Sequence, residues 1–145
     1  MLSLHKLIFP VLLLLFLSAC SATSNMTPVP TNPSVVEIDV TSGMPSPKWT
    51  LSDSEVEVIE QSLTALPPAD SASLFDGLGY RGFVVSLHSP ERLVRVQGGY
   101  ISIEEEGSQK IYIDTDHQLE KWLLEASRPH IEPELYSFLE EGIGR

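Results

Sequence analysis

The chain has 145 residues, which is enough for one domain and leaves little room for a second. Its 20 acidic and nine basic residues give a formal charge of −11. An acidic surface repels the phosphates of nucleic acids and of anionic lipid headgroups, so nucleic acid is not expected as a partner. The chain has one cysteine, which excludes an internal disulfide and zinc sites built from several thiolates.

The first twenty residues have the pattern of an export signal. His5 and Lys6 close a short basic region, and residues 7–17 are apolar apart from Pro10. This apolar stretch has the length of a signal segment and is short for a helix that spans a bilayer. The sequence Leu17-Ser18-Ala19-Cys20 then resembles the lipobox of bacterial lipoproteins: a large aliphatic residue, two small residues and cysteine.

The resemblance implies that residues 1–19 are a signal peptide, cleaved between Ala19 and Cys20. It also implies that the Cys20 sulfur receives a diacylglyceryl group and that the bilayer is a partner of the protein. Ser21 is not the aspartate associated with retention in the inner membrane. The expected location is therefore the bacterial cell envelope: the outer membrane of a Gram-negative cell, otherwise the outer leaflet of the cytoplasmic membrane.

Residues 20–34 are predicted to form the lipidated N-terminus and a flexible tether. The segment consists largely of Ser, Thr, Asn and Pro, which offer little apolar surface to offset the entropy of ordering. A flexible chain of this length spans about 20 Å. Without the signal peptide and its Lys6, the formal charge becomes −12.

The first half of the domain predicts one strand and one helix. Residues 35–40 alternate and are β-branched, and the glycine and prolines that follow end this strand before Trp49. Ser52 and Glu55 form a capping-box pattern that starts a helix over residues 53–65. Residues 67–78 are expected to be a loop.

The second half predicts four strands followed by two helices. The strands are expected at 80–87, 93–97, 100–104 and 110–113, and Gly98-Gly99 is read either as a hairpin turn or as a bulge in one long strand. Asp116 is expected to cap a helix that ends before Pro129, with Trp122 on its apolar stripe. A third helix is expected from Pro133 to Glu141, ending at Gly142.

Strands followed by segregated helices indicate an α+β domain over residues 35–145. We expect a small antiparallel sheet of about four to five strands, with two to three helices packed on one face. Strand alternation then assigns nine apolar residues to the covered face: Phe83, Val85, Leu87, Val94, Val96, Ile101, Ile103, Ile111 and Ile113. The opposite face is expected to carry aromatic and charged residues that could bind a partner: Tyr80, His88, Arg95, Tyr100, Tyr112 and Asp114.

The other candidate motifs have structural explanations. Gly77, Gly79 and Gly82 lack the Lys-Ser/Thr ending and the helix of a phosphate-binding loop. Asp114, Asp116 and His117 are too few for a calcium or zinc site and are explained by a strand end and a helix cap. We therefore expect no metal and no cofactor.

Three functions are compatible with the sequence. The first is a membrane-tethered interaction module that contacts another envelope protein, a glycan or a peptide. The second is an envelope hydrolase or ligand-processing enzyme with a site around His88, Arg95 and Asp114. The third is a passive structural or assembly role for the lipoprotein. The absence of a recognisable catalytic motif favours the first.

Overall fold

The computed structural model describes residues 32–41, 43, 45–70 and 74–143. The predicted signal peptide, the lipobox and most of the tether lie outside these residues. The strands are β1 (Val35–Thr41), β2 (Lys48–Thr50), β3 (Gly79–His88), β4 (Glu91–Gln97), β5 (Tyr100–Glu105) and β6 (Ser108–Ile113). The helices are α1 (Asp53–Ser62), a 3-10 turn η1 (Thr115–His117), α2 (Gln118–Ser127) and α3 (Pro133–Ile143).

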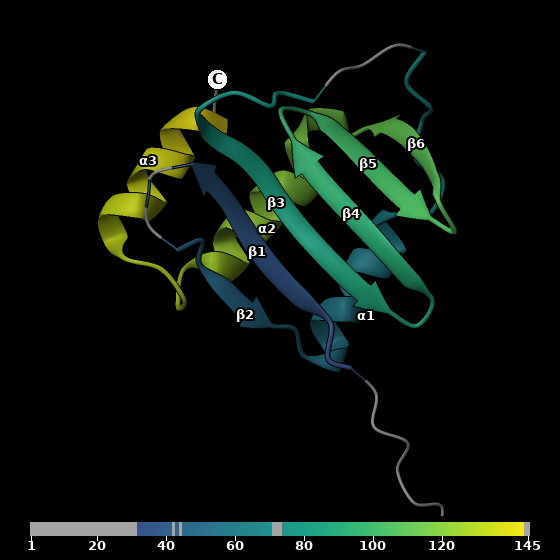
Figure 1. Cartoon of the computed structure of the whole chain (residues 1–145), viewed down its shortest axis with the longest axis horizontal. Coiled ribbons are helices and arrows are strands. Elements are labelled where there is room, and N and C mark those ends of the chain that lie inside the picture. The colour runs from purple at the N-terminus through teal and green to yellow at the C-terminus, as the bar shows by residue number, and fades with distance from the viewer. Residues whose placement is uncertain (1–31, 42, 44, 71–73, 144–145) are drawn as a thin grey trace, which may run out of the picture. The chain divides into compact units, whose positions relative to one another are not determined.

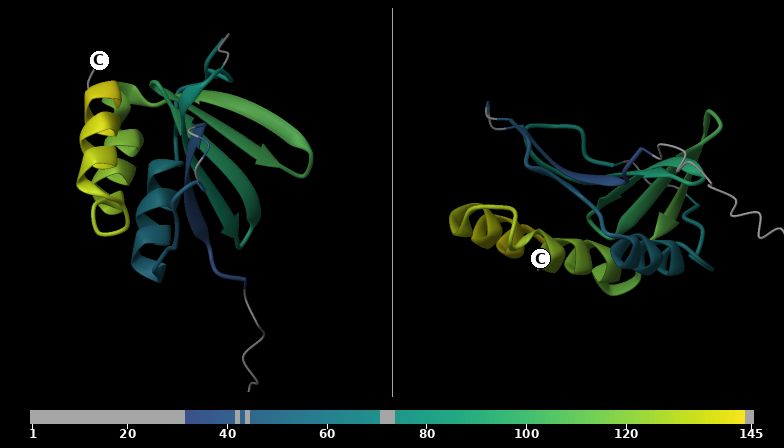
Figure 2. Two further views of the ribbon diagram at one scale, coloured as in Figure 1. Left: turned by 60° about the vertical axis from the view of Figure 1, so that its left-hand side comes forward. Right: turned by 90° about the horizontal axis from the view of Figure 1, so that it is seen from below.

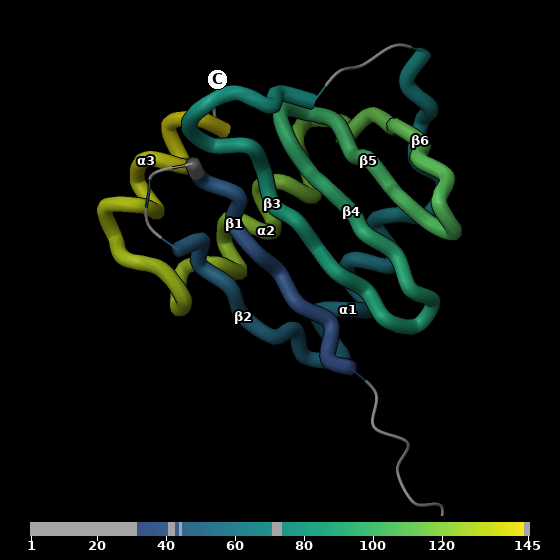
Figure 3. The backbone as a smooth tube through the Cα atoms, in the orientation of Figure 1, coloured from purple at the N-terminus to yellow at the C-terminus, as the bar shows by residue number. Residues whose placement is uncertain are grey.

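The six strands form one antiparallel sheet in the order β2-β1-β3-β4-β5-β6 (Figure 1). From β3 to β6 each strand pairs with the next, and the chain can be followed through this meander in Figure 3. Gly98 and Gly99 form a two-residue hairpin turn between β4 and β5, with φ values of +57° and +81°. A turn with two positive φ angles favours glycine at both positions, so the turn interpretation of this pair is correct.

The sheet has one more strand than the sequence predicted. Trp49 lies in the short strand β2, where it pairs with Val36 of β1 and is almost fully buried. The flanking Pro47 concealed this strand, because proline normally interrupts a sheet. At the opposite edge, the segment from Pro67 to Ala69 pairs with β6 through backbone hydrogen bonds of 2.9 and 3.0 Å. The β6 edge of the sheet is thereby partly covered, and the short strand β2 forms the other edge.

All three helices lie on the same face of the sheet (Figures 1 and 2). Helix α1 begins with the predicted capping box: Ser52 Oγ accepts from the Glu55 amide at 3.4 Å, and Glu55 Oε2 accepts from the Ser52 amide at 2.8 Å. An ion pair between Glu60 of α1 and Arg92 of β4 joins this helix to the sheet. Helix α3 continues through Gly142, because the next residue, Ile143, is buried in the core.

The core lies between the helices and the sheet, which confirms the predicted α+β class. Six of the nine apolar residues assigned to the covered face are fully or almost fully buried, Ile103 is partly buried, and Trp122 packs against the cluster. Ile111 and Ile113 are exceptions: they pair with Ser102 and Tyr100, whose side chains lie on the open face. Directly paired residues share a face of the sheet, so the assignment of these two isoleucines was wrong.

Among the residues that the structure describes, no helix combines the length and the hydrophobicity needed to cross a membrane.

Candidate functional site

The open face of the sheet is the face that the helices leave uncovered, and a bulge in β3 decides which residues reach it. Ile38 of β1 pairs with Phe83, whereas Val40 pairs with Tyr80, so β3 contains one extra residue between these pairs. Gly82 lies within this extra segment with a φ of +102°. As a result, Tyr80 and Phe83 both face the helices and make an edge-to-face contact with ring centroids 5.9 Å apart.

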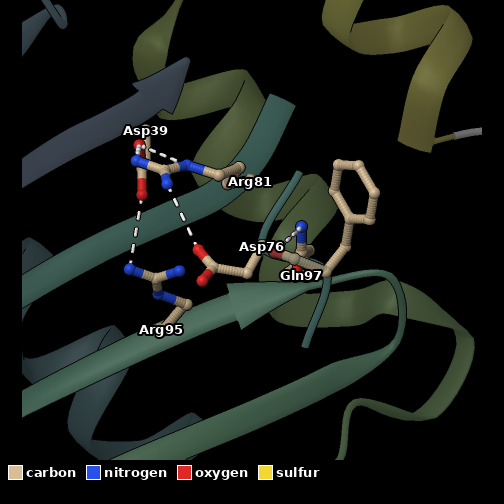
Figure 4. A network of polar contacts seen from close by, with 6 residues as sticks. Asp39, Asp76, Arg81, Arg95 and Gln97 are labelled. Atoms are coloured by element: carbon tan, nitrogen blue, oxygen red, sulfur yellow. Dashed lines mark hydrogen bonds and ion pairs between the residues drawn. The ribbon is translucent and has the colours of Figure 1, made fainter. Parts of the chain in front are cut away.

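Arg81 therefore lies on the open face, in a network of charged residues shown in Figure 4. Its Nη2 and Nε donate to Asp39 Oδ1 at 2.6 and 3.1 Å, and its Nη1 donates to Asp76 Oδ1 at 3.2 Å. Arg95 Nη2 lies 3.3 Å from the other Asp39 oxygen. Hydrogen bonding to Asp39 and the charge of this carboxylate raise the pKa of the Arg81 guanidinium. Both arginines are thus fixed in position, and their charges are balanced by two aspartates.

An open hollow of about 460 Å³ adjoins this network, over β4, β5 and β6. The surface is hollow here because Ser102, at the centre, has a small side chain. Ser102 pairs with Arg95 on one side and with Ile111 on the other. Gln109 donates a 2.7 Å hydrogen bond to the Ser102 hydroxyl. The hollow is lined by side chains of mixed character: Leu74, Asp76, Leu93, Arg95, Ser102, Glu104, Gln109 and Ile111.

Apolar side chains are exposed around the hollow. Leu93, Ile113 and Tyr100 are 43%, 40% and 36% exposed. Leu93 lines the hollow itself, and the paired residues Tyr100 and Ile113 lie next to it at the Gln97 end of the sheet. This face can therefore offer a ligand both apolar contacts and the donors of Arg95.

The structure does not bring the six predicted binding residues together on one face. Arg95 and Tyr100 lie on the open face, as expected. Tyr80 and Tyr112 are partly buried against the helix-side core, Tyr80 because of the bulge and Tyr112 because it pairs with the buried Ile101. Asp114 is also buried.

Asp114, rather than Asp116, caps the second long helix. Its two carboxylate oxygens accept from the amides of Leu119 and Glu120, each at 3.0 Å. Asp116 instead adopts a φ of +55° in the connecting turn, and its side chain makes no capping hydrogen bond. The prediction that Asp116 caps this helix was wrong. With the left-handed turn at Asp116, the carboxylate that reaches the amides at the start of the helix is that of Asp114, two residues earlier in the sequence.

The hypothesis of an envelope enzyme requires the side chains of His88, Arg95 and Asp114 to lie close together. His88 ends β3 and lines a separate hollow beside α1, whereas Asp114 lies near the Gly98-Gly99 turn, to which its amide is hydrogen-bonded. From the strand register, these two ends of the sheet are about 20 Å apart. The three side chains therefore do not form one catalytic group.

Within the described ranges, no cluster of three or more His, Cys, Asp or Glu side chains has an arrangement that could hold a metal ion. Asp114 and His117 instead take part in the contacts at the start of α2.

The sequence analysis missed Asp39 and Arg81 as members of the open-face network. Their contact depends on the pairing of β1 with β3 and on the bulge. The one local signal was Gly82, since a glycine inside a strand often marks a bulge.

Comparison with protein-family models, curated proteins and solved structures finds no match for this chain.

Proposed function

We propose that this protein is a lipid-anchored lipoprotein of the bacterial cell envelope, and that its domain binds a peptide or protein partner on the open face of its sheet. The lipobox-like segment ending at Cys20 supports the anchor. The open face supports the binding role.

The observation that carries the binding role is the hollow beside Arg95. The other face of the sheet is covered by helices, whereas this face combines an open concavity with three exposed apolar side chains. Apolar area provides most of the affinity of such surfaces, and a fixed arginine orients a partner through its carboxylate or carbonyl groups. Asp39 already holds Arg95, so little side-chain entropy would be lost on binding.

Site-specific photo-cross-linking in intact cells tests this proposal. A photoreactive residue at Leu93 reports on the hollow, and one at Glu105 serves as the control, because Glu105 belongs to the same part of the sheet but to the opposite face. We expect a discrete protein adduct from Leu93 and none from Glu105. Adducts of equal strength from both positions, or none from either, would contradict a partner on the open face.

A charge-matched pair of variants tests the role of Arg95. Arg95→Gln is expected to weaken the Leu93 adduct, while Lys110→Gln, which removes an exposed positive charge on the helix side of β6, should leave it unchanged. Arg81 still neutralises Asp39 in the Arg95 variant, so the fold should be retained. If both substitutions reduce the adduct equally, net charge rather than this site determines binding.

A further inference from the structure

A second concave surface lies on the helix side of the sheet, where the end of β1 faces α3. It is an apolar groove of about 600 Å³. Val40, Pro45 and Pro47 form its sheet side, and Ile131, Leu135 and Phe138 form its helix side. Figure 2 shows α3 running beneath this end of β1. The groove is separate from the open-face hollow and does not depend on the function proposed for it.

The groove exists because α3 uses only part of its apolar surface for the core. Tyr136, Leu139 and Ile143 are buried and anchor the helix. Leu135 and Phe138 project from a neighbouring strip into the groove, and Phe138 remains 55% exposed. A large aromatic side chain exposed in an apolar concavity is typical of a binding surface.

The groove has carboxylates along its helix side. Glu132 and Glu134 line it, and α3 contains two further glutamates and no basic residue. The nearby Arg128 is engaged by Glu125 Oε1 at 3.2 Å and by the Tyr136 hydroxyl at 2.6 Å. The groove therefore combines an apolar floor with a negative rim.

We propose that this groove binds a peptide segment whose bulky apolar side chains are flanked by lysine or arginine. The apolar side chains would occupy the space beside Phe138, and the basic residues would lie against Glu132 and Glu134. The acidic rim disfavours two other occupants. An anionic lipid surface would be repelled, and a second copy of this chain would place its own acidic helix against the same glutamates.

The test uses the chain from Thr31 onwards, which forms a compact unit of its own and contains every core residue. A short synthetic amphipathic peptide of leucine and lysine is titrated into the isotopically labelled protein, and backbone amide shifts are followed by NMR. We expect saturable shifts at Ile131, Leu135 and Phe138, with an affinity that falls as salt is added. A peptide of the same pattern with glutamate in place of lysine should give no such shifts.

Variants then locate the interaction. Phe138→Ser is expected to weaken binding about tenfold, since it removes most of one buried aromatic contact. Replacing both Glu132 and Glu134 by lysine should abolish binding of the leucine-lysine peptide and permit binding of the leucine-glutamate peptide. Glu140→Gln is the matched control, because it removes a charge from α3 outside the groove.

The proposal is overturned if the leucine-lysine peptide fails to bind, or if it binds Phe138→Ser and the double charge reversal as tightly as the unsubstituted chain. It is also overturned if the groove residues shift with protein concentration alone, which would indicate a second copy. Equal shifts on adding vesicles of phosphatidylglycerol would indicate a lipid surface instead. Thermal unfolding of each variant confirms that the fold is intact.

Discussion

Gly82 lies in the bulge of β3, which determines the faces of the sheet on which Tyr80 and Arg81 lie. A Cβ atom added there would lie 2.4 Å from the Val96 carbonyl oxygen, a backbone atom that cannot move aside, and the φ of +102° is unfavourable for other residues. We expect Gly82→Ala to lower the free energy of unfolding by about 2 kcal/mol more than Gly98→Ala. Gly98 is the control because it also has a positive φ but meets no atom within 4 Å. Urea denaturation measures both, and equal losses would show that the close contact is unimportant.

Tyr80 of β3 and Glu120 of α2 form a polar contact beside the core. Glu120 is only 1% exposed; its Oε1 accepts from the Tyr80 hydroxyl at 2.9 Å and from the Gly98 amide at 3.1 Å, and its Oε2 lies 3.0 Å from His117 Nδ1. Burial, together with the charge of Glu120 and the hydrogen bond to it, raises the pKa of Tyr80. The carboxylate thus joins α2 to the start of β3 and to the β4–β5 turn.

Tyr80→Phe is expected to lower the stability by about 1.5–3 kcal/mol, because a buried carboxylate loses a donor. A tyrosine with a raised pKa stabilises the fold fully below the pKa it has when unfolded, about 10, and less as the pH rises above that value. The stability difference between the two proteins should therefore shrink in alkali. Urea denaturation at neutral and alkaline pH measures this, and a difference that grows with pH would contradict the assignment.

The capping box of α1 is a local element that the sequence reveals directly. Hydrogen bonds from the Ser52 side chain and amide lower the pKa of Glu55. Such a group stabilises the fold at neutral pH, and this contribution is lost as the pH falls through its folded-state pKa. We expect Ser52→Ala to cost about 1 kcal/mol at neutral pH and less in acid. Ser62→Ala is the control, because the Ser62 hydroxyl lies at the other end of α1 and donates to the Val58 carbonyl rather than to the capping box. A loss that does not depend on pH would exclude the proposed coupling to Glu55.

Strand faces were harder to predict than helix starts, because they depend on pairing between distant residues. The Ile111-Tyr112-Ile113 pattern alone favours buried isoleucines, but the two-residue turn at Glu106-Gly107 fixes the register so that Tyr112 pairs with Ile101. The bulge at Gly82 reverses Tyr80 in the same way. Arg95 and Tyr100 were assigned correctly because β4 and the start of β5 alternate without interruption.

The acidic charge of the protein and the proposed lipid anchor have opposite effects at a membrane. If the chain is cleaved as proposed, its formal charge of −12 would be repelled by anionic headgroups, and attachment to a membrane would then require the lipid. One acyl chain binds a bilayer only weakly, whereas two or more hold a protein stably. If residues 20–34 form the flexible tether predicted from their composition, with a span of about 20 Å, the domain would reach partners close to the surface without embedding in it.

Cys20→Ser tests this anchor. We expect the unsubstituted chain to incorporate a clickable fatty-acid analogue and to fractionate with membranes, whereas Cys20→Ser should lose the label and leave the membrane fraction. Ser21→Ala should keep both properties. In the part of the chain that the structure describes, all core residues lie between Val36 and Ile143, so the melting temperature of the folded domain should be the same in all three proteins. If Cys20→Ser retains the label or its membrane association, the lipobox proposal fails, while binding at the open face and at the α3 groove would still be tested by their own variants.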